Sequence, residues 1–263
     1  MALIVAKFGG TSVASPERIK NVAKRLVGMR QRGDEVVAVV SAMGKTTDEL
    51  MGLASAITTA PPARELDRLL STGEQVSMTL LAMAIEALGY KSISFTGRQA
   101  GIETNGTQQG AHREGAQRAH LRRWTTAPFR GRGFQGIVPR RHRTLGRGGS
   151  DTTAVAIAWG INADVCEIYS DVDGVYTADP RVCPRAKKLD AVSYDDMLEL
   201  SGSGAGVLQM RAVEFARKYD VVIHSRSAFS EAEGTYIKEE TDMMEEAVIT
   251  GIAHDTSEVK VTI

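Results

Sequence analysis

The alternation of short apolar runs with helical segments constrains the fold of this chain most. Leu3–Phe8 is an apolar run of strand length, and Val36–Val40 reads VVAVV, the continuous pattern of a strand buried on both faces. Between them, Ser15–Glu17 supplies an N-cap, a proline at the first helical position and an early acid, and Gly33 marks the helix end. Strand-like and helical segments continue to alternate along the chain. This alternation predicts an α/β sandwich with a largely parallel sheet.

The loop after the first predicted strand has the composition of a phosphate-binding loop. Lys7–Ser12 reads KFGGTS, so a lysine precedes two glycines and two hydroxyl residues. Ligands of parallel sheets bind where loops leave the carboxyl ends of the strands. Glycines allow the backbone to approach phosphate closely, and the lysine would neutralise charge on a moving phosphoryl group. The alternative is a tight turn with a surface lysine.

A second glycine-rich loop stands directly before a predicted helix of small residues. Leu145–Thr153 reads LGRGGSDTT, and glycines followed by Ser, Asp and Thr at a helix N-terminus form an anion site. Arg147 lies among the glycines, and its planar guanidinium suits a carboxylate or a phosphate. This loop is therefore a second candidate for ligand binding.

A third loop follows the predicted strand Val165–Tyr169. Ser170–Arg181 reads SDVDGVYTADPR, which lacks the spacing and the distal glutamate of a calcium-binding EF-hand loop. Tyr176 and Arg181 on a loop shaped by glycine and proline instead suit the base, ribose and phosphates of a nucleotide.

An arginine-rich interval interrupts the regular pattern. The chain has 32 basic and 32 acidic residues, but Thr107–Arg147 holds ten arginines and one acid, and apolar periodicity is lost at 107–131 and 138–143. Three interpretations remain open: a nucleic-acid-binding insert in which Trp124 and Phe129 stack on bases, a divergent loop, or two compensating shifts of reading frame that replace a central strand.

Cysteine usage and hydropathy predict the compartment. Cys166 and Cys183 match neither a metal-binding spacing nor a disulfide framework, which suits a reducing compartment. The N-terminus lacks a basic region before an apolar segment, and there is no uninterrupted apolar run of membrane-spanning length. We therefore expect a cytoplasmic protein without membrane or nucleic-acid partners.

Seven motifs, in this order, resemble those of the aspartate kinases of the amino acid kinase family. They are Lys7–Ser12 (KFGGTS), Ser41–Gly44 (SAMG) with Thr46–Leu50 (TTDEL), Ser71–Glu74 (STGE), Ser94–Gly97 (SFTG), Gly133–Gly136 (GFQG), Leu145–Val155 (LGRGGSDTTAV) and Ser170–Arg181 (SDVDGVYTADPR). The resemblance extends over the chain outside 107–131 and 138–143 and is closest to the actinobacterial type. It implies the amino acid kinase fold, a three-layer αβα sandwich with a mainly parallel central sheet. It also implies phosphorylation of L-aspartate to 4-phospho-L-aspartate by ATP with magnesium, the first step of lysine, threonine and methionine biosynthesis.

The resemblance also implies a role for individual residues. Lys7 and Asp151 would be catalytic, while Glu74 would bind the ammonium of aspartate and Arg147 a carboxylate. Glu74 and Asp151 are both expected at helix starts, and no metal ligand is assigned. The expected nucleotide-binding residues are Lys7, Phe8, Gly9, Gly10, Ser41, Ser170, Asp171, Tyr176, Asp179 and Arg181. The expected aspartate-binding residues are Ser41, Thr47, Glu74, Arg147, Gly148, Gly149, Ser150 and Asp151.

One motif position departs from the family. Gly206 stands where the family usually has a lysine that contributes positive charge at the nucleotide phosphates, so weaker ATP binding or turnover is expected. Two alternatives to aspartate kinase activity stay open. One is another member of the family that acts on glutamate or carbamate, against which Glu74 and Arg147 argue. The other is an impaired or regulatory kinase-like subunit.

The motif order also predicts the domain organisation. Residues 1–246 are expected to form the catalytic domain, and residues 247–263 the linker and first strand of a truncated regulatory ACT region. We expect a homo-oligomer or association with a regulatory ACT-domain subunit, and an activity that lysine and threonine do not inhibit.

Overall fold

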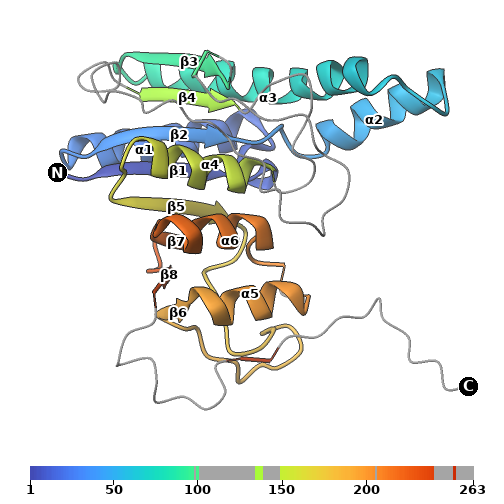
Figure 1. The fold of residues 1–263 in the computed structure, drawn as a ribbon. Coiled ribbons are helices and arrows are strands. Elements are labelled where there is room, and N and C mark those ends of the chain that lie inside the picture. Colours follow the sequence, from blue (N-terminus) through green and yellow to red (C-terminus); the bar gives the residue numbers. More distant parts are fainter. Residues whose placement is uncertain (98, 101–133, 139–148, 205, 240–250, 253–263) are drawn as a thin grey trace, which may run out of the picture.

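The computed structural model describes residues 1–97, 99–100, 134–138, 149–204, 206–239 and 251–252, and its centre is an eight-stranded sheet (Figure 1). The strands follow the order β3-β4-β2-β1-β5-β7-β8-β6, and all neighbours are parallel except β7 and β8. Their bounds are β1 Leu3–Phe8, β2 Glu35–Val40, β3 Ser92–Thr96, β4 Phe134–Val138, β5 Val165–Ser170, β6 Ala191–Ser193, β7 Ile223–Ser227 and β8 Thr235–Lys238. The mainly parallel sheet expected from the sequence is confirmed.

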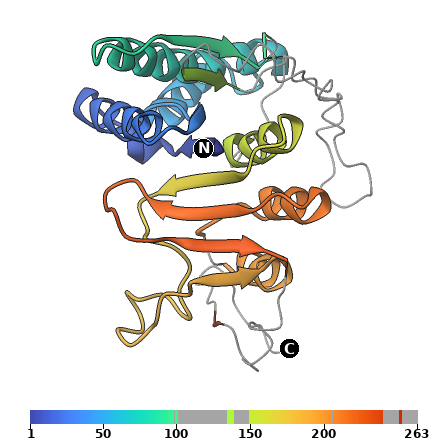
Figure 2. The same cartoon turned by 90° about the vertical axis from the view of Figure 1, so that its left-hand side faces the viewer.

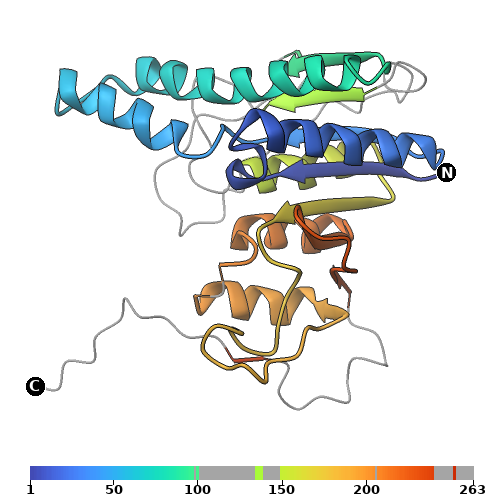
Figure 3. The same ribbon diagram turned by 180° about the vertical axis from the view of Figure 1, so that it is seen from behind.

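Helices cover both faces of this sheet. Helices α4, α5 and α6 lie in front of it in Figure 1, whereas α1 and α3 lie on the other side, as the views from the side and from behind show (Figures 2 and 3). The helices are η1 Gly10–Val13, α1 Pro16–Gln31, α2 Thr46–Ile57, α3 Ala63–Glu86, α4 Gly149–Gly160, α5 Tyr194–Gly202 and α6 Met210–Tyr219. The three-layer αβα sandwich is confirmed.

Each face of the sheet has its own apolar core. Val5 packs in the cluster that contains residues of α4 and α6, whereas Phe8 and Tyr169 pack with residues of α1 and α3. Successive residues of a strand point to opposite faces. Lys7 therefore shares the α4 face with Val5, and Phe8 lies on the α1 face.

Helix α1 begins and ends where the sequence predicts. The Ser15 hydroxyl accepts a hydrogen bond from the Arg18 amide at 3.3 Å, and Pro16 is the first helical residue. At the other end Gly33 adopts φ +96°, a left-handed conformation that glycine tolerates best. The helix thereby carries the chain from the end of β1 back to the start of β2.

Several elements differ from the sequence expectation. Helix α3 begins at Ala63, so Glu74 lies in the middle of a helix, and its expected place at a helix start is wrong. Helix α2 was not predicted, although Leu50, Leu53 and Ile57 have helical apolar spacing, and none of its residues is buried. Strands β6 and β8 were also missed, since they are only three and four residues long.

Strand β4 lies within the arginine-rich interval 107–147. It contains most of the GFQG motif and pairs with β2 on one side and β3 on the other, so the sheet is continuous at this position. Residues 107–131 and 139–143 lie outside the described residues, as do 247–250 and 253–263 of the expected ACT region. Within the described part of the chain, no helix has the length and apolarity needed to cross a membrane.

Candidate active site

A buried ion pair lies where β1 ends and α4 begins. The Lys7 Nζ atom is 2.5 Å from the Asp151 carboxylate, and the two side chains are only 10% and 9% exposed. Lys7 is the second-last residue of β1, and Asp151 lies in the first turn of α4. The alternative of a surface lysine is therefore wrong.

The two glycines after Lys7 hold neighbouring loops close to this pair. The Gly9 amide donates to the Tyr169 carbonyl at 3.2 Å, which ties the loop to β5, and the Gly44 amide donates to the Gly10 carbonyl at 3.0 Å. A Cβ atom on Gly10 would lie 2.8 Å from the Ala42 carbonyl oxygen. Only glycine therefore fits at position 10 without a shift of the backbone.

A pair of serines joins the SAMG loop to the start of α4. The hydroxyls of Ser41 and Ser150 are 2.8 Å apart, and the Ser41 amide donates to the Phe8 carbonyl at 3.1 Å. The first turn of α4 thus lies next to the first strand. A helix N-terminus combined with a buried lysine is an arrangement that suits a phosphate or carboxylate group.

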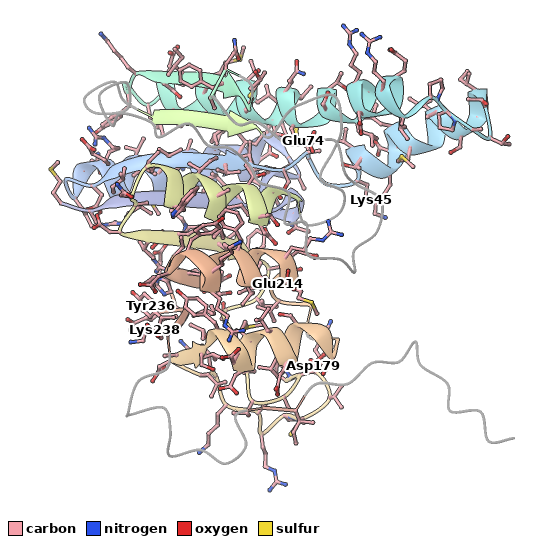
Figure 4. The ribbon with its side chains drawn as sticks, in the orientation of Figure 1. Lys45, Glu74, Asp179, Glu214, Tyr236 and Lys238 are labelled. Atoms are coloured by element: carbon pink, nitrogen blue, oxygen red, sulfur yellow. The ribbon has the colours of Figure 1, made fainter. Side chains whose placement is uncertain are left out.

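Helix α3 approaches the SAMG loop at a glycine that the sequence analysis did not single out. A Cβ atom on Gly73 would lie 2.9 Å from the Ala42 Cβ and 3.3 Å from the Thr46 Cγ2. The signal was present, because a glycine inside a helical pattern often marks close packing. The next residue, Glu74, is half-buried and lies with Lys45 near the edge where β1 and β2 end (Figure 4).

The other expected aspartate-binding residues differ in their location and exposure. Thr47 is exposed in the first turn of α2. Gly149 begins α4, and its carbonyl accepts a hydrogen bond from the Thr153 hydroxyl at 2.7 Å. Arg147 and Gly148 lie outside the described residues.

The loop after β5 is held by its own contacts. The Ser170 hydroxyl accepts a hydrogen bond from the Val172 amide at 3.3 Å, while Asp171 is exposed. Tyr176 forms an isolated antiparallel bridge with Lys188. These residues continue from the carboxyl end of β5, the neighbour of β1.

Two residues at the far end of this loop form a pair of their own. The Arg181 guanidinium contacts the Asp179 carboxylate at 2.7 Å, and the Arg181 side chain is 88% exposed. Asp179 lies well away from Glu74 in Figure 4. The two expected site residues Asp179 and Glu74 therefore do not lie side by side.

Gly206, which replaces the lysine usual in the family, is exposed, and a Cβ atom placed on it would meet nothing within 4 Å. A longer side chain would therefore enter open space. Within the described part of the chain, no neighbouring atom packs closely enough on position 206 to require glycine there.

The sequence analysis missed a buried polar network on β5. The Glu167 carboxylate accepts a hydrogen bond from the Tyr169 hydroxyl at 2.7 Å and from Arg226 Nη1 at 3.3 Å, and His224 Nδ1 lies 3.7 Å away. Burial opposes ionisation, but the bonds from His224 and Tyr169 and the charge of Arg226 outweigh it and lower the Glu167 pKa. The only hint in the sequence is one acid in an otherwise apolar strand.

The donor set fits a magnesium ion that arrives with a nucleotide. Among the described residues, no cluster of three or more His, Cys, Asp or Glu side chains forms a metal-binding cage. Mg²⁺ in phosphoryl-transfer sites is usually bound by one or two carboxylates together with substrate phosphates. Asp151, in the first turn of α4, and Asp171, after β5, are the carboxylates that could supply such ligands.

Comparison with known proteins agrees with this geometry. The model of the amino acid kinase family matches residues 2–225. An aspartokinase from Mycolicibacterium smegmatis is 52% identical over an alignment that takes in all of this chain and 64% of that protein. The chain thus spans about 64% of the length of the curated mycobacterial relatives that it matches.

Solved structures give the same result. The structure of aspartate kinase from Synechocystis superposes with a TM-score of 0.76 at 44% identity and covers 91% of this chain and 40% of that chain. The structure of E. coli aspartokinase III in complex with aspartate and ADP superposes with a TM-score of 0.77 at 26% identity, over 91% of this chain and 65% of that chain.

Proposed function

The chain belongs to the amino acid kinase family, and we propose that it acts there as an aspartate kinase, transferring the γ-phosphoryl group of ATP to the side-chain carboxylate of L-aspartate. The observation that carries the proposal is the buried Lys7–Asp151 pair at the junction of β1 and α4. The 52% identity to an aspartokinase supports aspartate as the acceptor. The product is 4-phospho-L-aspartate, and we place the reaction at the entry to lysine, threonine and methionine biosynthesis.

The reaction requires positioning and charge stabilisation more than proton transfer. The acceptor carboxylate is already ionised at neutral pH, so no general base is required. Phosphoryl transfer proceeds through a transition state whose charge is spread over the equatorial oxygens. Lys7 neutralises that charge, Asp151 fixes the position of the Lys7 ammonium, and the N-terminus of α4 adds its partial positive charge.

The acceptor is held by groups of opposite charge. Glu74 takes the ammonium group of aspartate and Arg147 takes a carboxylate, while Thr47 and the Ser41–Ser150 hydroxyl pair complete the pocket. Gly148, Gly149, Ser150 and Asp151 are the further residues proposed to bind aspartate. A shorter or longer acceptor would misplace the reacting carboxylate, and this favours aspartate over glutamate.

ATP is held by the loops that follow β1 and β5. The residues in this role are Lys7, Phe8, Gly9, Gly10, Ser41, Ser170, Asp171, Tyr176, Asp179 and Arg181. Arg181 can leave Asp179 at little cost because the Arg181 side chain is exposed to solvent. Magnesium enters with the nucleotide and supplies further neutralisation of phosphate charge when bound.

The cellular setting follows from the same proposal. ATP is a cytoplasmic substrate, and both cysteines are free thiols, as in a reducing compartment. We therefore place the protein in the cytoplasm. Assembly into a homo-oligomer, or with a regulatory ACT-domain subunit, remains a prediction that light scattering of the purified protein tests directly.

An ADP-release assay tests the proposed reaction. The purified chain is incubated with ATP, magnesium and L-aspartate, with L-glutamate and buffer alone as controls. ADP release that depends on aspartate, together with trapping of the acyl phosphate as a hydroxamate, supports the proposal. ADP release with glutamate alone assigns another reaction of the family. Absence of release with either amino acid favours an impaired or regulatory subunit, the role that Gly206 would explain.

A further inference from the structure

A basic cavity lies on the face of the sheet opposite Lys7. It has a volume of about 790 Å³ and lies between α1, the α1-facing side of β5 and β7, and the segment that follows β7. Seen from behind, β5 is in open view below α1 (Figure 3). Its volume is within the range of pockets that bind small molecules, about 300–1,000 Å³.

The charge of the cavity lining is strongly positive. Five cations line it, and Glu231 is the one acid in the lining. The cations are Arg18, Lys24, Arg25, Arg32 and Arg226. A lining of this charge attracts ligands that carry several negative charges.

Three arginines of α1 and its C-terminal cap form one stripe. Arg18, Arg25 and Arg32 are seven residues apart, and Asn21 and Gly28 occupy the intermediate positions of the same helical face. The adjacent face of the helix packs in the apolar core through residues such as Leu26. Burial of that apolar face orients α1 so that the stripe lies along the cavity.

Aromatic rings contact three of the guanidinium groups. The guanidinium carbon atoms of Arg25 and Arg226 lie 5.1 Å and 5.8 Å from the centre of the Tyr169 ring. The guanidinium carbon of Arg18 lies 5.0 Å from the centre of the Phe229 ring. Guanidinium groups fixed in this way lose less entropy when they bind a phosphate or carboxylate.

Two hydrogen-bond donors in the lining lack an acceptor. Ser12 Oγ and Arg226 Nε are buried, and neither has a hydrogen-bond partner among the described residues. Arg25 pairs with Glu231, whose side chain is 85% exposed, so this pair is weak and a stronger anion can replace the carboxylate. The cavity thus offers donors that an anionic ligand would satisfy.

We propose that this cavity binds a small ligand with a diphosphate or triphosphate group, at a site separate from the proposed active site. Lys7 and Phe8 point to opposite faces of β1, and the Tyr169 ring beneath the cavity stacks on Phe8 at a centroid distance of 4.6 Å. A ligand in the cavity therefore lies across the sheet from the Lys7–Asp151 pair. The inference does not depend on which amino acid the protein phosphorylates.

Calorimetric titration with inorganic pyrophosphate tests the site. We expect saturable binding, weakened at least tenfold in the double variant Lys24→Glu, Arg32→Glu, whose changed side chains are exposed. Lys20→Glu, on the same helix but outside the lining, should change the affinity less than twofold. Arg25→Gln, a second variant at the centre of the cavity, should also weaken binding.

The active-site variant Lys7→Ala separates the two locations. It should leave pyrophosphate affinity within twofold of the unchanged protein. Loss of binding in Lys7→Ala, equal weakening by Lys20→Glu, unchanged affinity in the double variant, or no saturable binding would each overturn the proposal. Each variant is first shown to be folded by its thermal unfolding curve.

A parallel titration with uridine diphosphate distinguishes two sources of the diphosphate group. Affinity at least tenfold higher than for pyrophosphate, and lost in Phe229→Ala, indicates a nucleotide whose base contacts the exposed Phe229 ring. Equal affinities indicate a ligand recognised through its phosphates alone. Either result keeps the proposed site, whereas binding of uridine diphosphate that survives in the Lys24→Glu, Arg32→Glu variant contradicts it.

Discussion

The Lys7 ammonium and the Asp151 carboxylate lie 2.5 Å apart, although three strands of the sheet, β2, β3 and β4, lie between β1 and α4 in the chain. Both side chains are buried, and each is the counter-charge of the other. A buried pair of this kind contributes little to stability by itself, because desolvation offsets the attraction between the charges. Its position at the carboxyl end of β1 is therefore better explained by function than by folding.

Replacement of Lys7 by alanine tests the charge at the transferring group. We expect kcat to fall by about 10²–10³-fold, the range found when one preorganised donor to a transition state is removed. The KM for aspartate should change little, because the Lys7 charge matters most in the transition state. Steady-state kinetics measures both quantities, and a loss confined to aspartate affinity would show that Lys7 has another role.

Replacement of Asp151 by asparagine tests whether this residue orients Lys7. The neutral amide keeps the shape of the side chain but leaves the Lys7 ammonium without its counter-charge. We expect kcat to fall, and the Lys7→Ala, Asp151→Asn double variant to be no slower than Lys7→Ala alone, since the two residues act as a unit. Additive losses in this double-mutant cycle would mean that they act independently.

Replacement of Gly73 by valine tests the close approach of α3 to the SAMG loop. Because even a Cβ atom would lie 2.9 Å from the Ala42 Cβ, the larger side chain must displace the loop or the helix. We expect a raised KM for aspartate, with Glu74 shifted from its position. Gly52→Ala in α2 is the matched control, because a Cβ there meets nothing within 4 Å. Equal kinetics for both variants would contradict this role of Gly73.

Replacement of Gly206 by lysine tests the departure from the family motif. Open space surrounds position 206, so the longer side chain should be accepted and bring a cation towards the nucleotide phosphates. We expect a lower KM for ATP or a higher kcat, and no such gain in Gly206→Ala, which changes the backbone preference without adding charge. If Gly206→Lys folds and neither constant improves, the departure is neutral.

The lowered pKa of Glu167 predicts a pH dependence of stability. With a pKa below its ordinary value of 4.5 in the folded state, Glu167 binds fewer protons there than in the unfolded chain. Its contribution to the free energy of unfolding is therefore present above about pH 4.5 and lost as the pH falls through the folded-state pKa. Urea unfolding from pH 7 to pH 3 should show this loss.

Glu167→Gln provides the comparison for that measurement. The variant should be about 1–3 kcal/mol less stable at pH 7, because Arg226 loses a charged partner, and the gap to the unchanged protein should narrow in acid. Glu199→Gln, at an exposed position, should show neither effect. A difference in stability between the variant and the unchanged protein that stays constant down to pH 3 would show that Glu167 is not the titrating group.

Local patterns in the sequence determined strands β1, β2 and β5, the bounds of α1 and the glycine-rich loops. Strand periodicity, the Ser15 cap and the glycine at position 33 act over a few residues, so they can be read without knowledge of the fold. The same holds for the motifs at Lys7 and Asp151, which were predicted as candidate site residues from their loops and their order. What each loop contacts was not contained in any of these patterns.

Tertiary structure alone decided the pairing of Lys7 with Asp151, the approach of Gly73 to Ala42, the network around Glu167 and the cavity beside α1. Each depends on residues that are far apart in the chain and meet only once the strands take their order in the sheet. Helix α2 shows the converse, since Leu50, Leu53 and Ile57 have helical spacing in the sequence, yet the structure buries none of the residues of this helix. The physical reason is that a side chain's partners, burial and charge environment are properties of the packed sheet and helices, whereas its periodicity is a property of the local chain.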